Sequence, residues 1–397
     1  MQPVVFSHFC VVTSIGAGQA ATLASLQDGV SGLRRSNSGI APPSLYVGEV
    51  AGFDEWSLEG DWAGFDCRNN RVAAMALNQD GFLDAVAGAR ERHGADRIGV
   101  FLGTSTSGIL QTEIAYRQRD LETGMLPANF DYARTHNTYS LGDFVRRYLR
   151  LDGPSVVVSS ACATTAKVFG NAVRMMAAGL CDAAVVGGAD TLCGTTLHGF
   201  RSLSLVSDEP CRPFDAERRG ISIGEGAGFA LLEKVAGGRD RRARVLLLGV
   251  GESSDAHHMS SPHPEGIGAR LAMERALAAA ALTPGDIDYV NLHGTATPVG
   301  DAAEDRAVSD LLGRTPCSST KGFTGHTLGA SGIIEAIFSA LSIVHGFMPG
   351  SPHTRTVDPT FRSRYMVEKR CTSVDRVISN SFGFGGANCS LVLGRAG

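Results

Sequence analysis

The stretch Val156-Val-Val-Ser-Ser-Ala-Cys162-Ala-Thr-Thr-Ala-Lys-Val168 places one cysteine between an apolar run and a helical pattern. The β-branched residues before the cysteine are typical of a buried strand. Residues 163–179 predict a helix that ends at Gly179. The apolar face of this helix consists of Val168, Ala172, Met175 and Met176. The sequence therefore predicts a strand, a tight turn that carries Cys162, and a helix whose N-terminus faces the thiol.

Similar strand and helix patterns alternate along the whole chain. The near-continuous apolar runs 183–188 and 245–250 predict strands covered on both faces, and residues 268–280 predict a helix. Alternation of such elements is typical of a layered α/β fold. We therefore expect α/β/α layers that share a central layer of helices.

The chain also repeats itself around a charged, glycine-bearing segment, residues 233–244. The matching pairs are 97–104 with 288–295, 220–233 with 380–393, and the Cys162 segment with 317–345. We interpret this order as a duplicated α/β unit, with domains at 1–236 and 237–397. The alternative is that an α/β fold reuses strand–glycine–helix turns without any duplication.

Composition narrows the function classes. The formal net charge is −4 and there is no dense basic run, so nucleic-acid binding is not expected. The N-terminus lacks signal-peptide features, and acidic residues interrupt the longest apolar stretches, so we expect a cytoplasmic protein without a membrane span. Nine scattered cysteines without a Cys-x-x-Cys pair indicate reduced thiols and no zinc site.

Cys162 is either a small core residue or a nucleophile. A thiol at a helix N-terminus is expected to have a lowered pKa, which favours nucleophilic chemistry. Two histidines, His293 and His326, lie in Gly/Thr-rich turns at strand ends and strengthen that interpretation. The glycine cluster 383–386 precedes a strand rather than a helix, so it does not indicate a dinucleotide site.

Several further motifs occur in one order along nearly the whole chain. They are Ser160-Ala-Cys162-Ala-Thr, Pro213-Phe-Asp-Ala-Glu-Arg-Arg-Gly, Gly224-Glu-Gly-Ala-Gly, His293-Gly-Thr-Ala-Thr-Pro-Val-Gly-Asp, Ser319-Thr-Lys321, Thr324-Gly-His326 and Asn380-Ser-Phe-Gly-Phe-Gly-Gly-Ala-Asn. In these motifs the chain resembles β-ketoacyl-acyl-carrier-protein synthases of the thiolase superfamily. The resemblance implies a five-layer α/β/α/β/α fold, a homodimer or a heterodimer with a related subunit, and decarboxylative Claisen condensation.

The resemblance also implies roles for individual residues. Cys162 would carry the acyl chain, and His293 and His326 would stabilise the enolate formed from malonyl-acyl carrier protein. The backbone amides of Cys162 and Phe384 would form the oxyanion hole, with Phe384 also acting as a gate. The supporting residues would be Lys321, Glu335 and Asn291, and the pantetheine arm would contact Thr295 and Thr297. No free cofactor is expected, since the carrier protein brings its own prosthetic group.

Substrate and partner are less sharply indicated. Thr106 falls where the family often has a bulkier residue, and this smaller side chain predicts a longer acyl pocket. A separate prediction is that an acidic acyl carrier protein docks on three arginines, Arg68, Arg71 and Arg201. Fatty-acid elongation and a polyene or polyketide pathway both remain open; a short segment at 191–210 fits the latter.

Two other functions compete with this interpretation of the sequence. A non-elongating partner of the chain-length-factor type would lack the nucleophile that this chain has. A degradative thiolase would need a second catalytic cysteine, but Cys389 falls within a predicted strand. The sequence also departs from the family at Arg218-Arg-Gly-Ile221, where Arg-Asp-Gly-Phe is usual.

Overall fold

The computed structural model of this 397-residue chain describes residues 1–36, 39–53, 56–235 and 244–396. Most of the predicted linker 233–244, and the proposed boundary between 236 and 237, lie outside the described residues. The boundary therefore stays a prediction.

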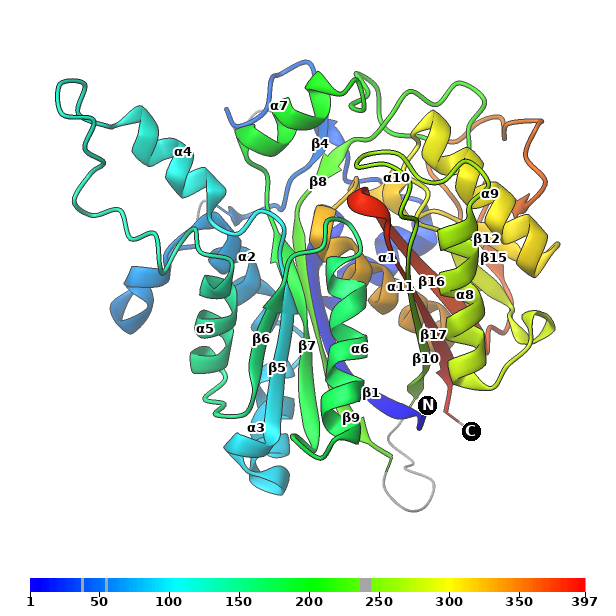
Figure 1. Cartoon of the computed structure of the whole chain (residues 1–397), viewed down its shortest axis with the longest axis horizontal. Helices are drawn as coiled ribbons and strands as arrows, with labels where there is room; N and C mark the ends of the chain where they lie inside the picture. The colour runs from blue at the N-terminus through cyan, green and yellow to red at the C-terminus, as the bar shows by residue number, and fades with distance from the viewer. Residues whose placement is uncertain (37–38, 54–55, 236–243, 397) are drawn as a thin grey trace.

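One hydrogen-bonded path of strands runs through the molecule in the order β14-β12-β11-β16-β17-β10-β1-β9-β7-β5-β6 (Figure 1). The strands of its first half are β1 (Val4–Thr13), β5 (Ile98–Gly103), β6 (Ser155–Val158), β7 (Ala183–Asp190) and β9 (Gly226–Lys234). Those of its second half are β10 (Val245–Ser254), β11 (Tyr289–Asn291), β12 (Pro316–Ser318), β14 (Arg364–Tyr365), β16 (Arg376–Gly383) and β17 (Ala387–Arg395).

The two halves have the same topology. In the first, β6, β5 and β7 are parallel, and β9 and β1 follow as antiparallel strands. In the second, β12, β11 and β16 are parallel, and β17 and β10 follow as antiparallel strands. A short antiparallel pairing of β1 with β10 joins them. The predicted duplication of an α/β unit is confirmed.

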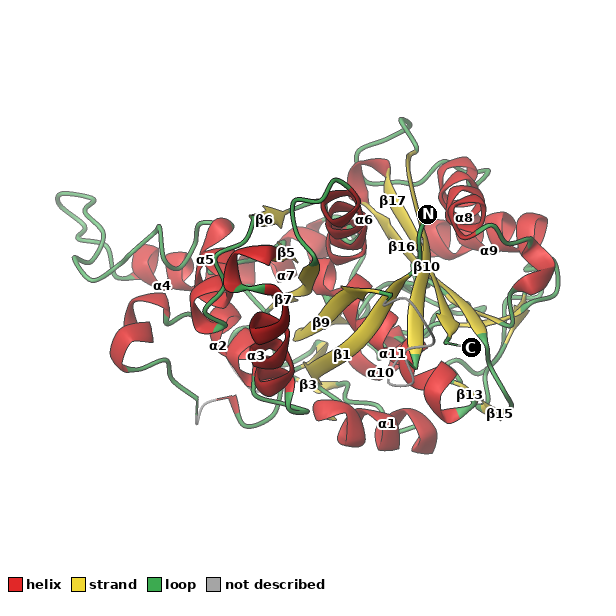
Figure 2. Cartoon of the chain, turned by 90° about the horizontal axis from the view of Figure 1, so that it is seen from below, coloured by secondary structure: helices red, strands yellow, loops and turns green. Residues whose placement is uncertain are grey.

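Helices cover both halves and fill the space between them (Figure 2). The central helices are α6 (Thr164–Ala177) and α11 (Ser331–His345). The outer face of the first half carries α2 (Arg68–Leu77), α3 (Phe82–His93) and α5 (Tyr139–Tyr148), and that of the second half carries α8 (Ile267–Ala280) and α9 (Pro298–Leu312). This arrangement is the predicted five-layer α/β/α/β/α fold.

The largest apolar cluster lies in the central layer, where α6 and α11 pack against the inner faces of both halves. Residues 328–345 are long and apolar enough to cross a membrane by length and composition alone, with a mean hydropathy of 1.6. Because 89% of this stretch is buried inside the molecule, it is the core helix of the fold. Each buried Ile or Phe of such a helix contributes about 2 kcal/mol to folding.

Element ends differ slightly from the sequence prediction. The first central helix covers 164–177 rather than 163–179, and Gly179 follows with a φ of 74°. The strand predicted at 288–295 ends at Asn291. It ends early because the backbone amides of His293 and Gly294 donate to the Glu304 carboxylate instead of to a neighbouring strand.

Candidate active site

Cys162 lies in a tight turn between β6 and α6 and is only 6% exposed. Ala161 adopts a φ of 47°, a left-handed conformation that few non-glycine residues take. Thr164 holds the turn, because its hydroxyl accepts from the Ser160 amide at 2.7 Å and donates to the Ala161 carbonyl at 2.6 Å. The strained backbone positions the thiol just before the first turn of α6, as the sequence predicted.

The charge state of this thiol differs from the prediction. Burial raises the pKa of Cys162 to about 11, outweighing the positive charge of Lys321 and the backbone amide of Phe384, which both lower it. The expected lowering of the Cys162 pKa at the helix N-terminus is therefore wrong. The cysteine is a thiol at neutral pH and needs a base to become the nucleophilic thiolate.

Both predicted histidines meet Cys162. The Nε2 atom of His326 lies 3.0 Å from the Cys162 Sγ atom, and the rings of His293 and His326 are 5.3 Å apart, centre to centre. Burial, followed by the charge of Lys321, lowers the pKa of each histidine well below its ordinary value. Both imidazoles are therefore neutral at pH 7, so each can accept or donate a proton.

Lys321 determines which nitrogen of His293 carries hydrogen. The lysine Nζ atom lies 3.4 Å from His293 Nδ1 and also donates to the His293 carbonyl and to the Glu335 carboxylate. An ammonium group can only donate, so Nδ1 acts as the acceptor and the ring proton sits on Nε2. Asn291 supports this group from below through a 3.4 Å hydrogen bond from its Nδ2 to the Glu335 carbonyl.

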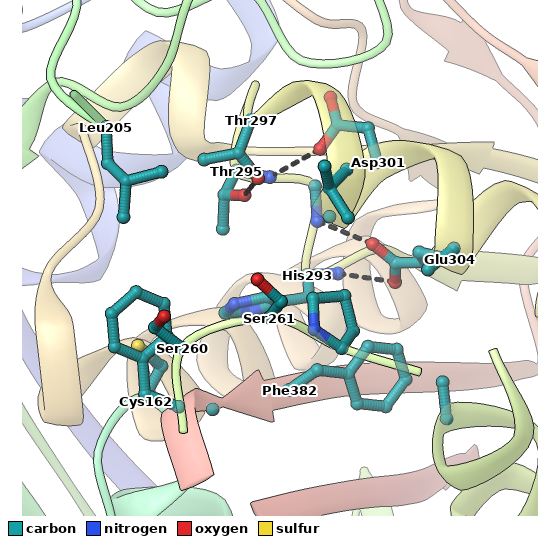
Figure 3. A pocket seen from close by; sticks show the side chains of 18 of the residues that line it. Cys162, Leu205, Ser260, Ser261, His293, Thr295, Thr297, Asp301, Glu304 and Phe382 are labelled. Carbon is teal, nitrogen blue, oxygen red and sulfur yellow. Dashed lines mark hydrogen bonds between the residues drawn. The ribbon is translucent and has the colours of Figure 1, made fainter. Parts of the chain in front are cut away.

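Two buried carboxylates on α9 shape the histidine turn (Figure 3). Glu304 accepts from the amides of His293 and Gly294, and Asp301 accepts from the amide of Thr295. Burial raises their pKa values, to about 7 for Glu304 and about 6 for Asp301. Neither residue was predicted to have a role, although two carboxylates one helical turn apart after Thr297-Pro298 are a signal visible in the sequence.

Two cavities meet at Cys162. The first, of about 200 Å³, is lined by His293 and His326 together with Thr295 and Thr297, whose hydroxyls lie 2.9 Å apart. The second, of about 440 Å³, is lined by Thr106, Leu203, Leu328 and others. Cys162, Phe200 and Phe384 line both. A substrate can therefore approach the thiol from one side and extend away from it on the other.

Thr106 lies in the second cavity because of a carboxylate that the sequence analysis missed. Asp190, fully buried at the end of β7, accepts from the hydroxyl and amide of Thr106, both at 2.7 Å. Its other oxygen accepts from the Ala330 amide at 3.2 Å. Asp190 thus fixes two segments that line this cavity, residues 104–106 and 328–330.

Two of the predicted docking arginines lie together and the third lies on another helix. Arg68 and Arg71 share one face of α2, where both guanidinium groups stack over Phe53. Arg68 makes a two-pronged pair with the buried Glu225 and is only 10% exposed, so it is corrected from a free surface cation to a structural residue. Arg71 pairs with Asp66 on the same helix end. Arg201 is exposed on α7 (Gly194–Ser202), beside Phe200, and makes no ion pair within the described part of the chain. Its docking role stays a prediction.

The cysteine and two histidines could also ligate a metal by type and proximity. Their ligand atoms lie within 4.8 Å of one another, and zinc accepts sulfur and imidazole ligands. The expectation of a metal-independent site therefore stays a prediction. Cys389, the residue weighed for a second thiolase cysteine, is fully buried in β17 and belongs to the core.

Comparisons with known proteins show which family the chain belongs to. Residues 51–236 match the model of the β-ketoacyl synthase N-terminal domain, and residues 245–355 match that of the C-terminal domain. A mitochondrial 3-oxoacyl-[acyl-carrier-protein] synthase of Arabidopsis thaliana is 35% identical over 98% of this chain and 92% of its own. A 3-oxoacyl-[acyl-carrier-protein] synthase 2 of Vibrio cholerae is 34% identical over 84% of this chain and 86% of its own.

Solved structures of ketosynthases are also similar to this chain. A chain from a ketosynthase in complex with its chain length factor, from Xenorhabdus doucetiae, superimposes with a TM-score of 0.89 at 35% identity, covering 100% of this chain and 98% of that one. A chain of the ishigamide ketosynthase/chain length factor superimposes with a TM-score of 0.89 at 29% identity, with complete coverage of both chains. The protein belongs to the β-ketoacyl synthase family of condensing enzymes, built on the thiolase fold.

Proposed function

We propose that this β-ketoacyl synthase elongates an acyl chain held on Cys162 by two carbons taken from malonyl-acyl carrier protein. The observation that carries the proposal is the convergence of Cys162, His293 and His326 at the junction of two cavities. The first cavity receives the pantetheine arm along Thr295 and Thr297, and the second receives the acyl tail.

The first step transfers the acyl group. His326 takes the Cys162 proton at Nε2, and the resulting thiolate attacks the thioester carbonyl of the acyl carrier. The amides of Cys162 and Phe384 stabilise the oxyanion. The C–S bond to the carrier then breaks, and the departing thiolate takes the proton from His326. The 3.0 Å contact of His326 with the sulfur serves this step.

The second step generates the carbon nucleophile. The malonyl C–C bond to the carboxylate breaks, carbon dioxide leaves, and the electron pair forms an enolate with its charge on the thioester oxygen. His293 donates from Nε2 to that oxygen, because Lys321 holds its Nδ1 as an acceptor. His326 joins it as a second donor: its Nδ1 has no hydrogen-bond partner among the described residues, so no contact fixes its tautomer.

In the third step the enolate carbon attacks the acyl carbonyl on Cys162. The tetrahedral oxyanion forms in the same amide hole, and its collapse breaks the C–S bond to Cys162. The β-ketoacyl chain leaves on the carrier protein, and the Cys162 thiolate takes a proton from bulk water through His326. No free cofactor takes part, because both thioesters arrive on carrier-borne pantetheine.

The chain also acts with a second, related subunit under this proposal. The support is that two structures similar over their whole length are ketosynthase complexes with chain length factors. An intact Cys-His-His set makes this chain the elongating member of such a pair. Its product is a specialised polyene or polyketide chain, with ordinary fatty-acid elongation as the competing outcome.

The test follows the mass of the Cys162 peptide. The chain, alone and with a co-expressed ketosynthase-like subunit, is incubated with a panel of acyl carrier proteins and then with malonyl-acyl carrier protein. We expect acylation at Cys162, elongation by two carbons, and loss of both in Cys162→Ala. Near wild-type elongation by Cys162→Ala would refute the nucleophile, and failure of Cys162 to accept any acyl group would assign the chain to the non-elongating class.

A further inference from the structure

A second aromatic side chain lies opposite the predicted gate. Phe200, on α7, is half-buried, and its ring centre lies 5.5 Å from that of Phe384, with the ring planes at 52°. Phe200, Phe384 and Cys162 line both cavities. The two rings therefore stand at the boundary that an acyl tail crosses when its carbonyl reaches the thiol.

The present ring separation is too small for a substrate. A chain lying between two rings needs a contact of about 3.5–4 Å with each, so the ring centres must be about 7–8 Å apart. Since they are 5.5 Å apart, one ring has to move before a tail passes.

The backbone on each side indicates which ring moves. Phe384 lies between Gly383 and the pair Gly385–Gly386, whose φ values of 75° and 74° are ones that glycine adopts readily. Phe200 lies on helix α7 and packs against an apolar cluster that includes Leu197 and Leu328. The first turn of this helix is also capped from outside. Glu113 of α4 (Ile109–Arg117) accepts from the amides of Gly194 and Thr195 at 3.0 and 2.6 Å. Phe200 is therefore the fixed wall and Phe384 the moving one.

We propose that Phe200 is a specificity-determining residue that limits the width of the passage and selects flat, unbranched acyl chains. This inference rests on the proposed condensation at Cys162, because it concerns the tail attached there. A straight or conjugated tail lies flat against the fixed ring, whereas a methyl branch near the carbonyl adds width on the side that Phe200 blocks. One such methyl changes enzyme selectivity by about 10-fold or more.

The test compares acylation of Cys162 by octanoyl- and 3-methyloctanoyl-acyl carrier protein, measured by mass spectrometry over time. We expect Phe200→Ala to raise the ratio of branched to straight acylation rates by about 10-fold, and Phe200→Leu to raise it less. His198→Ala, an exposed change on the same helix, is the matched control and should leave the ratio unchanged. An acetyl donor, which has no tail, should acylate Phe200→Ala and the wild type at similar rates.

The outcomes separate the two proposals. An unchanged branched-to-straight ratio in Phe200→Ala, with normal acetylation, would overturn the role of Phe200 and leave the condensation intact. If His198→Ala raised the branched-to-straight ratio as well, the effect would belong to α7 in general, and the role proposed for Phe200 would be overturned. Failure of the wild type to be acylated by any donor would instead refute the proposed function.

Discussion

At the scale of single residues, the meeting of Cys162, His293 and His326 was predictable from the sequence, and the electrostatics of the cluster was not. Cys162, His293 and His326 stand in short motifs with distinct local patterns. The pKa of Cys162 depends on its burial and on Lys321, more than 150 positions away in the sequence. Asp190 and Glu304 escaped prediction for the same reason, because what makes them important is the set of amides that the fold brings to them.

The raised pKa of Cys162 predicts the pH dependence of its alkylation. Only the thiolate reacts, and below a pKa of about 11 the thiolate fraction rises about tenfold per pH unit. Alkylation of Cys162 by iodoacetamide should therefore keep rising from pH 7 to pH 10. Mass spectrometry of the Cys162 peptide measures the rate, with the exposed Cys371 as an internal reference. A plateau below pH 8 would show a preformed thiolate–imidazolium pair instead.

The two histidines should separate kinetically. His326 contacts the Cys162 sulfur, and Lys321 contacts His293. Under the proposed mechanism His326 acts in both steps and His293 acts on the enolate alone. His293→Ala should lower malonyl decarboxylation by about 100-fold and leave acylation of Cys162 largely intact, the size expected for one lost oxyanion donor. His326→Ala should slow both steps. Carbon dioxide release and the mass of the acylated peptide measure the two steps; equal loss of acylation in both variants would contradict this division.

At the scale of elements, long periodic segments were predicted well and their ends less well. The helix after Cys162 and the core helix 331–345 follow directly from apolar periodicity. The strand at 289–291 came out shorter than predicted, since Glu304 takes the amides that would have continued it. Helix α7 was not predicted at all. Five of its nine residues are glycine, threonine or serine, and only Leu197 and Arg201 are strong helix formers. Its first turn also depends on Glu113 from a helix distant in the sequence.

That dependence gives a prediction for α7. Replacing Glu113 by Ala leaves the amides of Gly194 and Thr195 without their acceptor, and loss of such a cap destabilises a helix by about 1 kcal/mol. Hydrogen exchange of the amides in 194–202 should accelerate about fivefold. Glu122→Ala, an exposed change beyond the end of α4, should leave exchange in α7 as it is. Equal protection of α7 in both variants would show that its cap is not needed.

At the scale of the whole molecule, the duplicated topology was readable because the two halves repeat motifs in the same order. What the sequence did not show is that the single chain leaves the β6 edge of the sheet open. β6 is the last strand of the path, and within the described residues nothing pairs with its outer edge. An unpaired apolar strand is a site for association with another chain. Beside this half of the sheet, α4 and the loop that follows project from the body (Figure 1).

This projection predicts where a second subunit binds. Its exposed large apolar side chains are Ile114, Tyr116, Leu121, Met125 and Tyr132. Leu121 is 86% exposed, so Leu121→Asp should leave the fold unchanged. Burying an aspartate in place of a leucine forfeits at least about 1.5 kcal/mol of apolar burial, which weakens association by about tenfold or more.

Val30→Asp, at a 52% exposed site outside this projection, is the matched control. Native mass spectrometry of the chain, alone and with a co-expressed related subunit, should show the dimer population fall for Leu121→Asp only. An unchanged dimer population in Leu121→Asp, or an equal fall in Val30→Asp, would place the subunit interface elsewhere.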